Sequence, residues 1–183
     1  MNCYGAKDIA AAFRTVRKNT IVIAEEIDES KYSFQPAKDT RTVAQQLVHI
    51  AVIPRLQLHI HAVEKLNTVV GFNFVEFVAP LKAEEQKPRS KAEIVALLKE
   101  SGDKFASWVE QLSDDFLAEH VSMPPGMQPD FKTRFEMLLG TKEHEMHHRA
   151  QLMLIQRMLG IVPHLTREFQ ARVAAMQAAS SKT

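Results

Sequence analysis

Four long segments of the chain carry apolar residues at alternating spacings of three and four, the pattern of helices that bury one face. The first runs from Lys7 to Ile27, and the others begin after Thr42, Ser90 and Thr133. In the first segment the core-facing positions are Ile9, Phe13, Val16, Thr20, Ile23 and Ile27. No comparable stretch alternates strictly between apolar and polar residues, so the pattern predicts helices and no strands.

Capping boxes mark where the last three of these helices begin. In this motif a Ser or Thr side chain accepts a hydrogen bond from the backbone N–H three residues on, and a Glu or Gln there reaches back. The fourth helix is closed by Gly160 and Pro163, which are typical of a helix end. The three capping pairs are Thr42 with Gln45, Ser90 with Glu93, and Thr133 with Glu136.

The remaining segments connect the four helices. Ser30 to Thr40 and Ser113 to Lys132 contain prolines and little periodicity, and the second is long enough to cross the length of a bundle. Val69 to Leu81 is apolar but fits neither helix nor strand, and we interpret it as a connection that covers one end of the core, as a pocket wall or as a subunit interface. Thr166 to Ala178 predicts a short appended helix, followed by a frayed tail at 180–183.

Together these elements predict an all-α fold, a four-helix bundle with long crossover connections. A chain of 183 residues with 45% apolar residues fits one domain, spanning 1–183, with a core at about 6–160 and the appended helix at about 166–178.

Composition and charge exclude several classes of protein. The formal net charge of +1, without a basic cluster, gives no electrostatic basis for binding nucleic acid. Cys3 is the single cysteine, so no internal disulfide forms, and we expect it to be neither ligand nor nucleophile. The N-terminus does not resemble a secretion signal and no apolar run is long enough to span a membrane. We therefore expect a soluble, cytoplasmic protein without a membrane partner.

The fourth helix carries the most informative pattern of the chain. His144 and His148 lie one turn apart on its core-facing stripe, close enough to bind one metal ion, whereas His147 is rotated by about 100° from His148. A His-rich helix whose inward rings are hydrogen-bonded to core partners would give the same pattern. The full stripe is Met137, Thr141, His144, His148, Gln151, Ile155 and Met158.

The second helix places a third histidine on a core-facing surface. Its stripe contains His49, and Pro54 is expected to kink the helix just after that residue, because proline removes a backbone hydrogen bond. His49 alone would fit a structural core histidine equally well. His59 and His61 lack inward partners in this pattern, and we expect them at the surface.

Two alternative interpretations use Glu145. The letters from His144 to His148 satisfy H-E-x-x-H, the zinc metalloprotease motif, in which the Glu activates water and Glu168 is a candidate third ligand. However, Leu154 stands where the metzincin motif has a further His, and no strand is predicted to align a peptide. Glu145 with His148 also makes one Glu-x-x-His, but a di-iron centre needs two copies, and no second one is found.

The third interpretation combines His49 with His144 and His148. Three neutral imidazoles leave coordination positions open for water or substrate, as in catalytic rather than structural metal sites. The segments 42–50 (TVAQQLVHI) and 144–152 (HEMHHRAQL) resemble the DinB/YfiT-like family of metal-binding four-helix bundles, and the similarity in spacing and helix order extends over about 6–160. The sequence departs from the family in having Ala150 where Gly is frequent, and in carrying Pro54.

The resemblance implies that His49, His144 and His148 bind a divalent transition metal, Zn, Ni or Fe, and that the protein forms a homodimer. Because the family includes thiol-dependent S-transferases, it also implies a small-molecule substrate and a low-molecular-weight thiol such as bacillithiol, mycothiol or glutathione. A metal-bound thiol would have a lowered pKa and could attack an electrophile.

Two other functions remain open at this point: a metal-dependent hydrolase that activates water, and a non-catalytic metal-binding protein. No catalytic residue is assigned. Arg149 points away from the His144/His148 stripe, so we expect it to make a structural ion pair.

Overall fold

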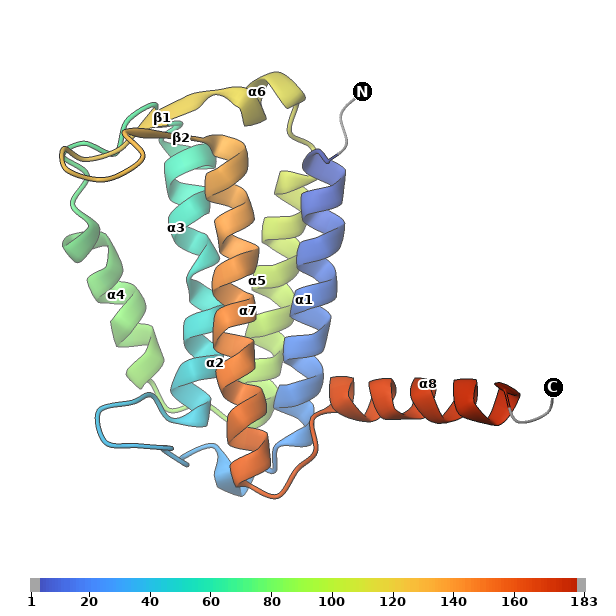
Figure 1. Ribbon diagram of the computed structural model, residues 1–183. Coiled ribbons are helices and arrows are strands. Elements are labelled where there is room, and N and C mark those ends of the chain that lie inside the picture. Colours follow the sequence, from blue (N-terminus) through green and yellow to red (C-terminus); the bar gives the residue numbers. More distant parts are fainter. Residues whose placement is uncertain (1–3, 181–183) are drawn as a thin grey trace.

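The computed structural model describes residues 4–180, and its centre is a bundle of four helical rods (Figure 1). Three rods are single helices, and the fourth is formed by α2 and α3, which a π-helical turn, η2, continues. The predicted four-helix bundle is thus confirmed. The elements of the bundle are α1 (Ala6–Glu26), α2 (Val43–Val52), α3 (Pro54–Leu58), η2 (His59–Val63), α5 (Lys91–Val109) and α7 (Arg134–Met158).

The connections contain more regular structure than the sequence predicts. α4 lies beside the bundle, α6 and the β1–β2 hairpin cover one end, and α8 projects from the other end (Figure 1). The two strands pair antiparallel, with Val121 opposite Lys132. These elements are η1 (Glu29–Lys31), α4 (Phe74–Gln86), α6 (Asp114–Ala118), β1 (His120–Ser122), β2 (Phe131–Thr133) and α8 (His164–Ser180).

The predicted helix starts are confirmed atom by atom. At α2 the Thr42 hydroxyl accepts from Gln45 N at 3.2 Å, and Gln45 Oε1 accepts from Thr42 N at 2.9 Å. Equivalent boxes open α5 and α7. Gly160, just past the end of α7, has φ +78°, which glycine adopts at low cost. The frayed tail and Cys3 lie, except for Ser180, outside the described residues.

The two larger apolar clusters form most of the buried core of the described residues. One surrounds Phe13 and Phe105, whose ring centroids are 4.7 Å apart, and the other surrounds Leu47, Ile94 and Leu152. All five side chains are fully buried. Burying a side chain of this size stabilises the fold by about 1.5–3 kcal/mol, so the clusters hold the rods in register.

Pro54 interrupts the rod formed by α2 and α3, as predicted, and the interruption has a structural use. Proline has no N–H, so the Ile50 carbonyl lacks its helical donor. That carbonyl accepts instead from Arg17 Nη2 at 3.2 Å. Arg17 is 3% exposed, and a Cβ at Gly102 would lie 2.8 Å from its Cγ, so Gly102 leaves space for this side chain.

Three predictions, two for connecting segments and one for His61, are wrong. Val69 to Leu81 is expected to fit neither helix nor strand, but it contains most of helix α4, with Pro80 inside it. The crossover at 113–132 holds α6 and two short strands, where no strand was expected. His61 is fully buried rather than at the surface.

The burial of His61 depends on partners far away in the sequence. Arg134 Nη1 lies 2.9 Å from His61 Nδ1, while Gln57 Oε1 lies 3.0 Å from His61 Nε2. Burial, reinforced by the Arg134 charge, lowers the His61 pKa to about 4. Arg134 is itself held by Glu119, so this cluster ties the crossover to the start of α7.

Within residues 4–180, no helix combines the length and apolar character needed to cross a membrane.

Candidate metal centre

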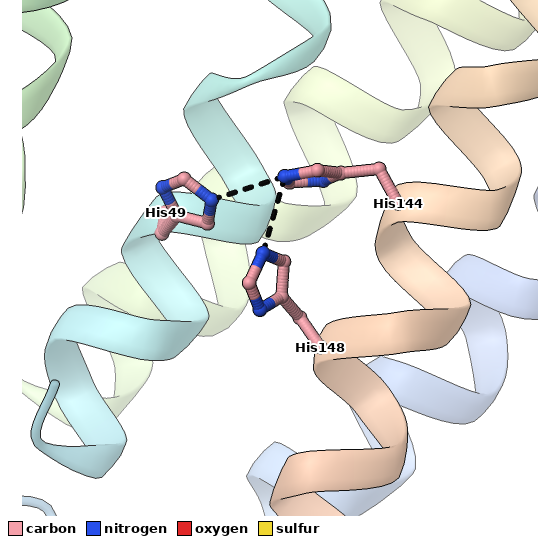
Figure 2. A group of neighbouring side chains, drawn as sticks. All are labelled: His49, His144 and His148. Atoms are coloured by element: carbon pink, nitrogen blue, oxygen red, sulfur yellow. Dashed lines mark hydrogen bonds between the residues drawn. The ribbon is translucent and has the colours of Figure 1, made fainter. Parts of the chain in front are cut away.

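The structure brings His49, His144 and His148 together between α2 and α7, with their rings turned toward one another (Figure 2). His144 Nε2 lies 3.2 Å from His49 Nε2 and 3.1 Å from His148 Nε2. His49 and His148 are each 9% exposed. The helical phase predicted for the three residues is therefore confirmed, while their role as metal ligands stays a prediction.

The outer nitrogens of two of these rings have acceptors that fix the tautomer. His49 Nδ1 lies 2.8 Å from Glu85 Oε1, and His148 Nδ1 lies 2.8 Å from Gln151 Oε1. An N–H at each Nδ1 donates to these oxygens, which leaves a lone pair on each Nε2. Both lone pairs point at the Nε2 of His144, which carries at most one proton and cannot donate to both.

A second set of contacts holds these acceptors in place. Arg41 Nε donates to Glu85 Oε2 at 2.6 Å, and Gln46 Nε2 donates to Gln151 Oε1 at 3.1 Å. Contacts of this kind orient metal-binding imidazoles and raise their basicity. Gln46 and Glu85 are 5% and 7% exposed, so these two side chains are at least as buried as His49 and His148.

The protonation states at the centre suit a cation. Burial, together with the neighbouring histidines, lowers the pKa of His144 to about 3. Burial also lowers the pKa of His148 to about 4, although its bond to Gln151 opposes this. For Glu85, burial raises the pKa, but hydrogen bonds from His49 and Arg41 outweigh it, and the pKa is lowered. At neutral pH, His144 and His148 are neutral, and Glu85 is a carboxylate.

Two of the nitrogen separations at the centre fit a transition metal, and the three ligand nitrogens all lie within 4.8 Å of one another. Two imidazoles that bind Zn²⁺ at about 2.0–2.1 Å in tetrahedral geometry have nitrogens about 3.3 Å apart, close to the separations found here. Imidazole suits Zn, Ni and Fe alike, so the donor set does not select among these metals. A group of three protein ligands leaves a position for water or substrate.

Glu145 takes no part in the centre, which contradicts the protease and di-iron interpretations. Its carboxylate accepts from Arg17 Nε and Nη2 at 2.9 Å each, and from the Thr20 hydroxyl at 2.7 Å. The Arg17–Glu145 pair is buried between α1, α5 and α7, and Glu145 is 2% exposed. Glu168 belongs to α8, which projects from the bundle (Figure 1), and it is not among the clustered ligand atoms.

Two other predictions concern the neighbours on α7. His147 is exposed, its Nε2 lies 3.1 Å from Gln151 Nε2, and its ring packs edge-on against His148; it is not among the clustered ligand atoms and lies off the stripe as predicted. Arg149 makes no ion pair within residues 4–180, and its Nε is buried without a hydrogen-bond partner. The ion pair predicted for Arg149 is therefore wrong.

Two clefts reach the centre from different sides of the histidine cluster. The larger, of about 600 Å³, is lined by His148, and the smaller, of about 330 Å³, by His144. The lining of the larger cleft includes the charged residues Asp39, Arg41 and Lys82. No residue lines both clefts, so His148 and His144 each face a different one, while His49 lines neither.

The sequence interpretation missed Glu85, the acceptor for His49. Glu85 lies on α4, shortly after the segment Val69 to Leu81 that the sequence interpretation treated as a connection. A signal was present, because Phe77, Leu81 and Glu85 recur at a spacing of four, and Leu81 and Glu85 are buried. A helical stripe that ends in a carboxylate would have indicated a partner for a core histidine.

These features define a helical bundle with a three-histidine candidate metal centre. The chain belongs to the DinB superfamily, whose model matches residues 12–152. It is 23% identical over 155 residues to the protein YjoA of Bacillus subtilis, covering 85% of this chain and 91% of YjoA.

Solved structures share the fold. The DinB-like protein YjoA from Bacillus subtilis superposes with a TM-score of 0.58 at 21% identity, covering 83% of this chain and 92% of its own. YfiT from the same organism, described as a probable metal-dependent hydrolase with an unusual four-helix-bundle topology, gives 0.65 at 16% identity, covering 85% and 88%. A protein from Clostridium difficile 630 gives 0.65 at 14% identity, covering 86% and 98%.

Proposed function

We propose that this protein is a metal-dependent enzyme that transfers a low-molecular-weight thiol to an electrophilic small molecule. The thiol loses its proton, its sulfur forms a bond to the electrophilic carbon, and the leaving group of that carbon departs with the bonding electrons. One observation carries the proposal: the three-histidine cluster lies between two clefts, one reaching His148 and the other His144. A transfer reaction needs space for two reactants at one centre, and two separate clefts supply it.

Each residue of the centre has a defined role in this proposal. His49, His144 and His148 hold the metal, while Glu85 and Gln151 keep the Nδ1 protons in place and turn the Nε2 lone pairs inward. A bound divalent metal supplies a positive charge that lowers the pKa of a thiol, so that more thiolate is present near neutral pH.

The larger cleft fits the thiol reactant. Lys82 makes no ion pair within residues 4–180, and Arg41 uses Nε and Nη2 on Glu85, which leaves its other terminal nitrogen available. Asp39 supplies the opposite charge on the same lining. Groups of both signs suit a thiol with carboxylates and an amine, such as glutathione or bacillithiol, better than the uncharged mycothiol.

A metal-dependent hydrolase is the second candidate, because YfiT, which shares the fold, is described as a probable metal-dependent hydrolase. A metal lowers the pKa of water as well as that of a thiol, so the same three histidines serve either nucleophile. A non-catalytic metal-binding protein is the third. The open position and the two clefts favour catalysis over this last alternative.

The test compares nucleophiles in one assay. Protein reconstituted with Zn²⁺, Ni²⁺ or Fe²⁺ is incubated with 4-nitrobenzyl chloride and with each of the three thiols, and products are identified by mass spectrometry. We expect thiol conjugates above the uncatalysed rate, with the two charged thiols preferred, and loss of activity in His148→Ala. Equal conjugation by wild type and His148→Ala would refute the transfer, and product formed only without thiol would identify a hydrolase.

A further inference from the structure

The smaller cleft has the character of a binding site for an apolar small molecule. Its volume is about 330 Å³, at the low end of the range for ligand pockets. An apolar cavity of about 150 Å³ already binds benzene, so the cleft has room for one substituted ring. Six residues of its lining are apolar, Ile53, Leu56, Ile60, Phe74, Met123 and Met137, and the polar Gln57, Lys132 and Glu136 line it as well.

One residue that lines this cleft, Thr141, carries a buried polar group without a partner among the described residues. Thr141 is 4% exposed, and its hydroxyl makes no hydrogen bond within residues 4–180. A buried hydroxyl without a partner costs free energy, so such groups are rare unless a ligand or water completes them. Thr141 lies on α7 three residues before His144, and both line the cleft.

We infer that the smaller cleft binds the electrophile, a molecule with an apolar body about one ring in size, and that the Thr141 hydroxyl hydrogen-bonds a polar group next to its reacting carbon. This inference names the substrate class for the proposed transfer and rests on that function. The apolar walls remove the ring from water, and the hydroxyl fixes which end faces His144. Thr141 is thus a positioning and specificity residue.

Gly140 offers a direct way to fill the cleft. It lines the same space, and a Cβ built on it meets no heavy atom within 4 Å. The first atom of a side chain at Gly140 therefore has open space, so we use Gly140→Leu to reduce the volume of the cleft, and replacing glycine within a helix favours folding. Ala150→Leu is the matched control, since it adds a leucine at an exposed position of the same helix.

The experiment measures binding of 4-nitrobenzyl alcohol, an unreactive analogue of the chloride, by calorimetry on zinc-loaded and on metal-free protein. We expect wild type and Ala150→Leu to bind equally and Gly140→Leu to bind at least about tenfold more weakly. Thermal unfolding of Gly140→Leu at or above the wild-type temperature shows that the fold is retained. Absence of binding to wild type, or unchanged binding to Gly140→Leu, would overturn the inference.

Thr141→Val tests the polar contact, because valine has a similar shape and no hydroxyl. We expect it to bind the alcohol roughly 3- to 10-fold more weakly, as for the loss of one hydrogen bond, and to bind 4-nitrotoluene as wild type does. An equal loss for both ligands would show a packing role and contradict the assignment. Because no thiol or turnover is involved, failure of the proposed transfer would leave this binding result intact, and the reverse also holds.

Discussion

Breaking the buried ion pair between Arg17 and Glu145 tests whether Glu145 is structural, in spite of its place in an H-E-x-x-H sequence. The two side chains are 3% and 2% exposed and share three contacts of 2.9–3.1 Å. Removing one partner of such a pair leaves a buried charge uncompensated, which costs about 3–5 kcal/mol. We expect losses of this size in Glu145→Leu and in Arg17→Met.

The double variant should lose less than either single variant. Arg17→Met with Glu145→Leu buries no unpaired charge, but the Ile50 carbonyl, freed by Pro54, then lacks its donor. An unsatisfied buried carbonyl costs about 1–3 kcal/mol. The coupling between the two substitutions is therefore about 3 kcal/mol or more, with the double variant more stable than the sum of the single variants predicts.

Urea unfolding at pH 7 on metal-free protein measures these values, because metal binding would otherwise add to the stability of the folded state. Zinc titration of Glu145→Gln, at a temperature where it is folded, adds an independent check: we expect one metal per chain. Additive losses in the cycle, or single losses below about 1 kcal/mol, would refute the structural role. Loss of metal binding in Glu145→Gln would show that Glu145 takes part in the metal centre.

Further predictions concern the metal, the pH dependence and the assembly. Wild type should hold one divalent metal per chain by elemental analysis, with His144→Ala losing it and His147→Ala retaining it; equal loss in both would contradict the observed geometry. Glu85→Ala should weaken zinc affinity by roughly 10- to 100-fold in competition titrations, and an unchanged affinity would deny its orienting role. The pKa of His61 is lowered to about 4 in the folded protein, so on acidification the unfolded chain binds a proton at a higher pH than the folded chain. The free energy of unfolding therefore falls as the pH drops from about 6.5 to 4, by up to about 3 kcal/mol. Urea unfolding at pH 7.5 and 5 should show a smaller fall in His61→Gln, and parallel curves would refute this. Light scattering tests the homodimer expected for the family, and a monomer at micromolar concentration would contradict it.

The sequence alone determined the elements whose signals are local. Capping boxes and a spacing of three and four depend on residues within one or two turns, so the starts of α2, α5 and α7 could be predicted to the residue. The same phase argument placed His144 and His148 on one face, and His49 on a core-facing stripe.

Only the tertiary structure decided which faces meet. Glu85, 36 residues after His49, reaches it because α4 folds back along α2, and Arg17 meets Glu145 across 128 residues. His61 is buried because Arg134, on another rod, supplies its partner. Periodicity reports the direction of a side chain from its own helix, but hydrogen bonds, buried charges and clefts arise between helices, where packing of the whole chain selects the partner.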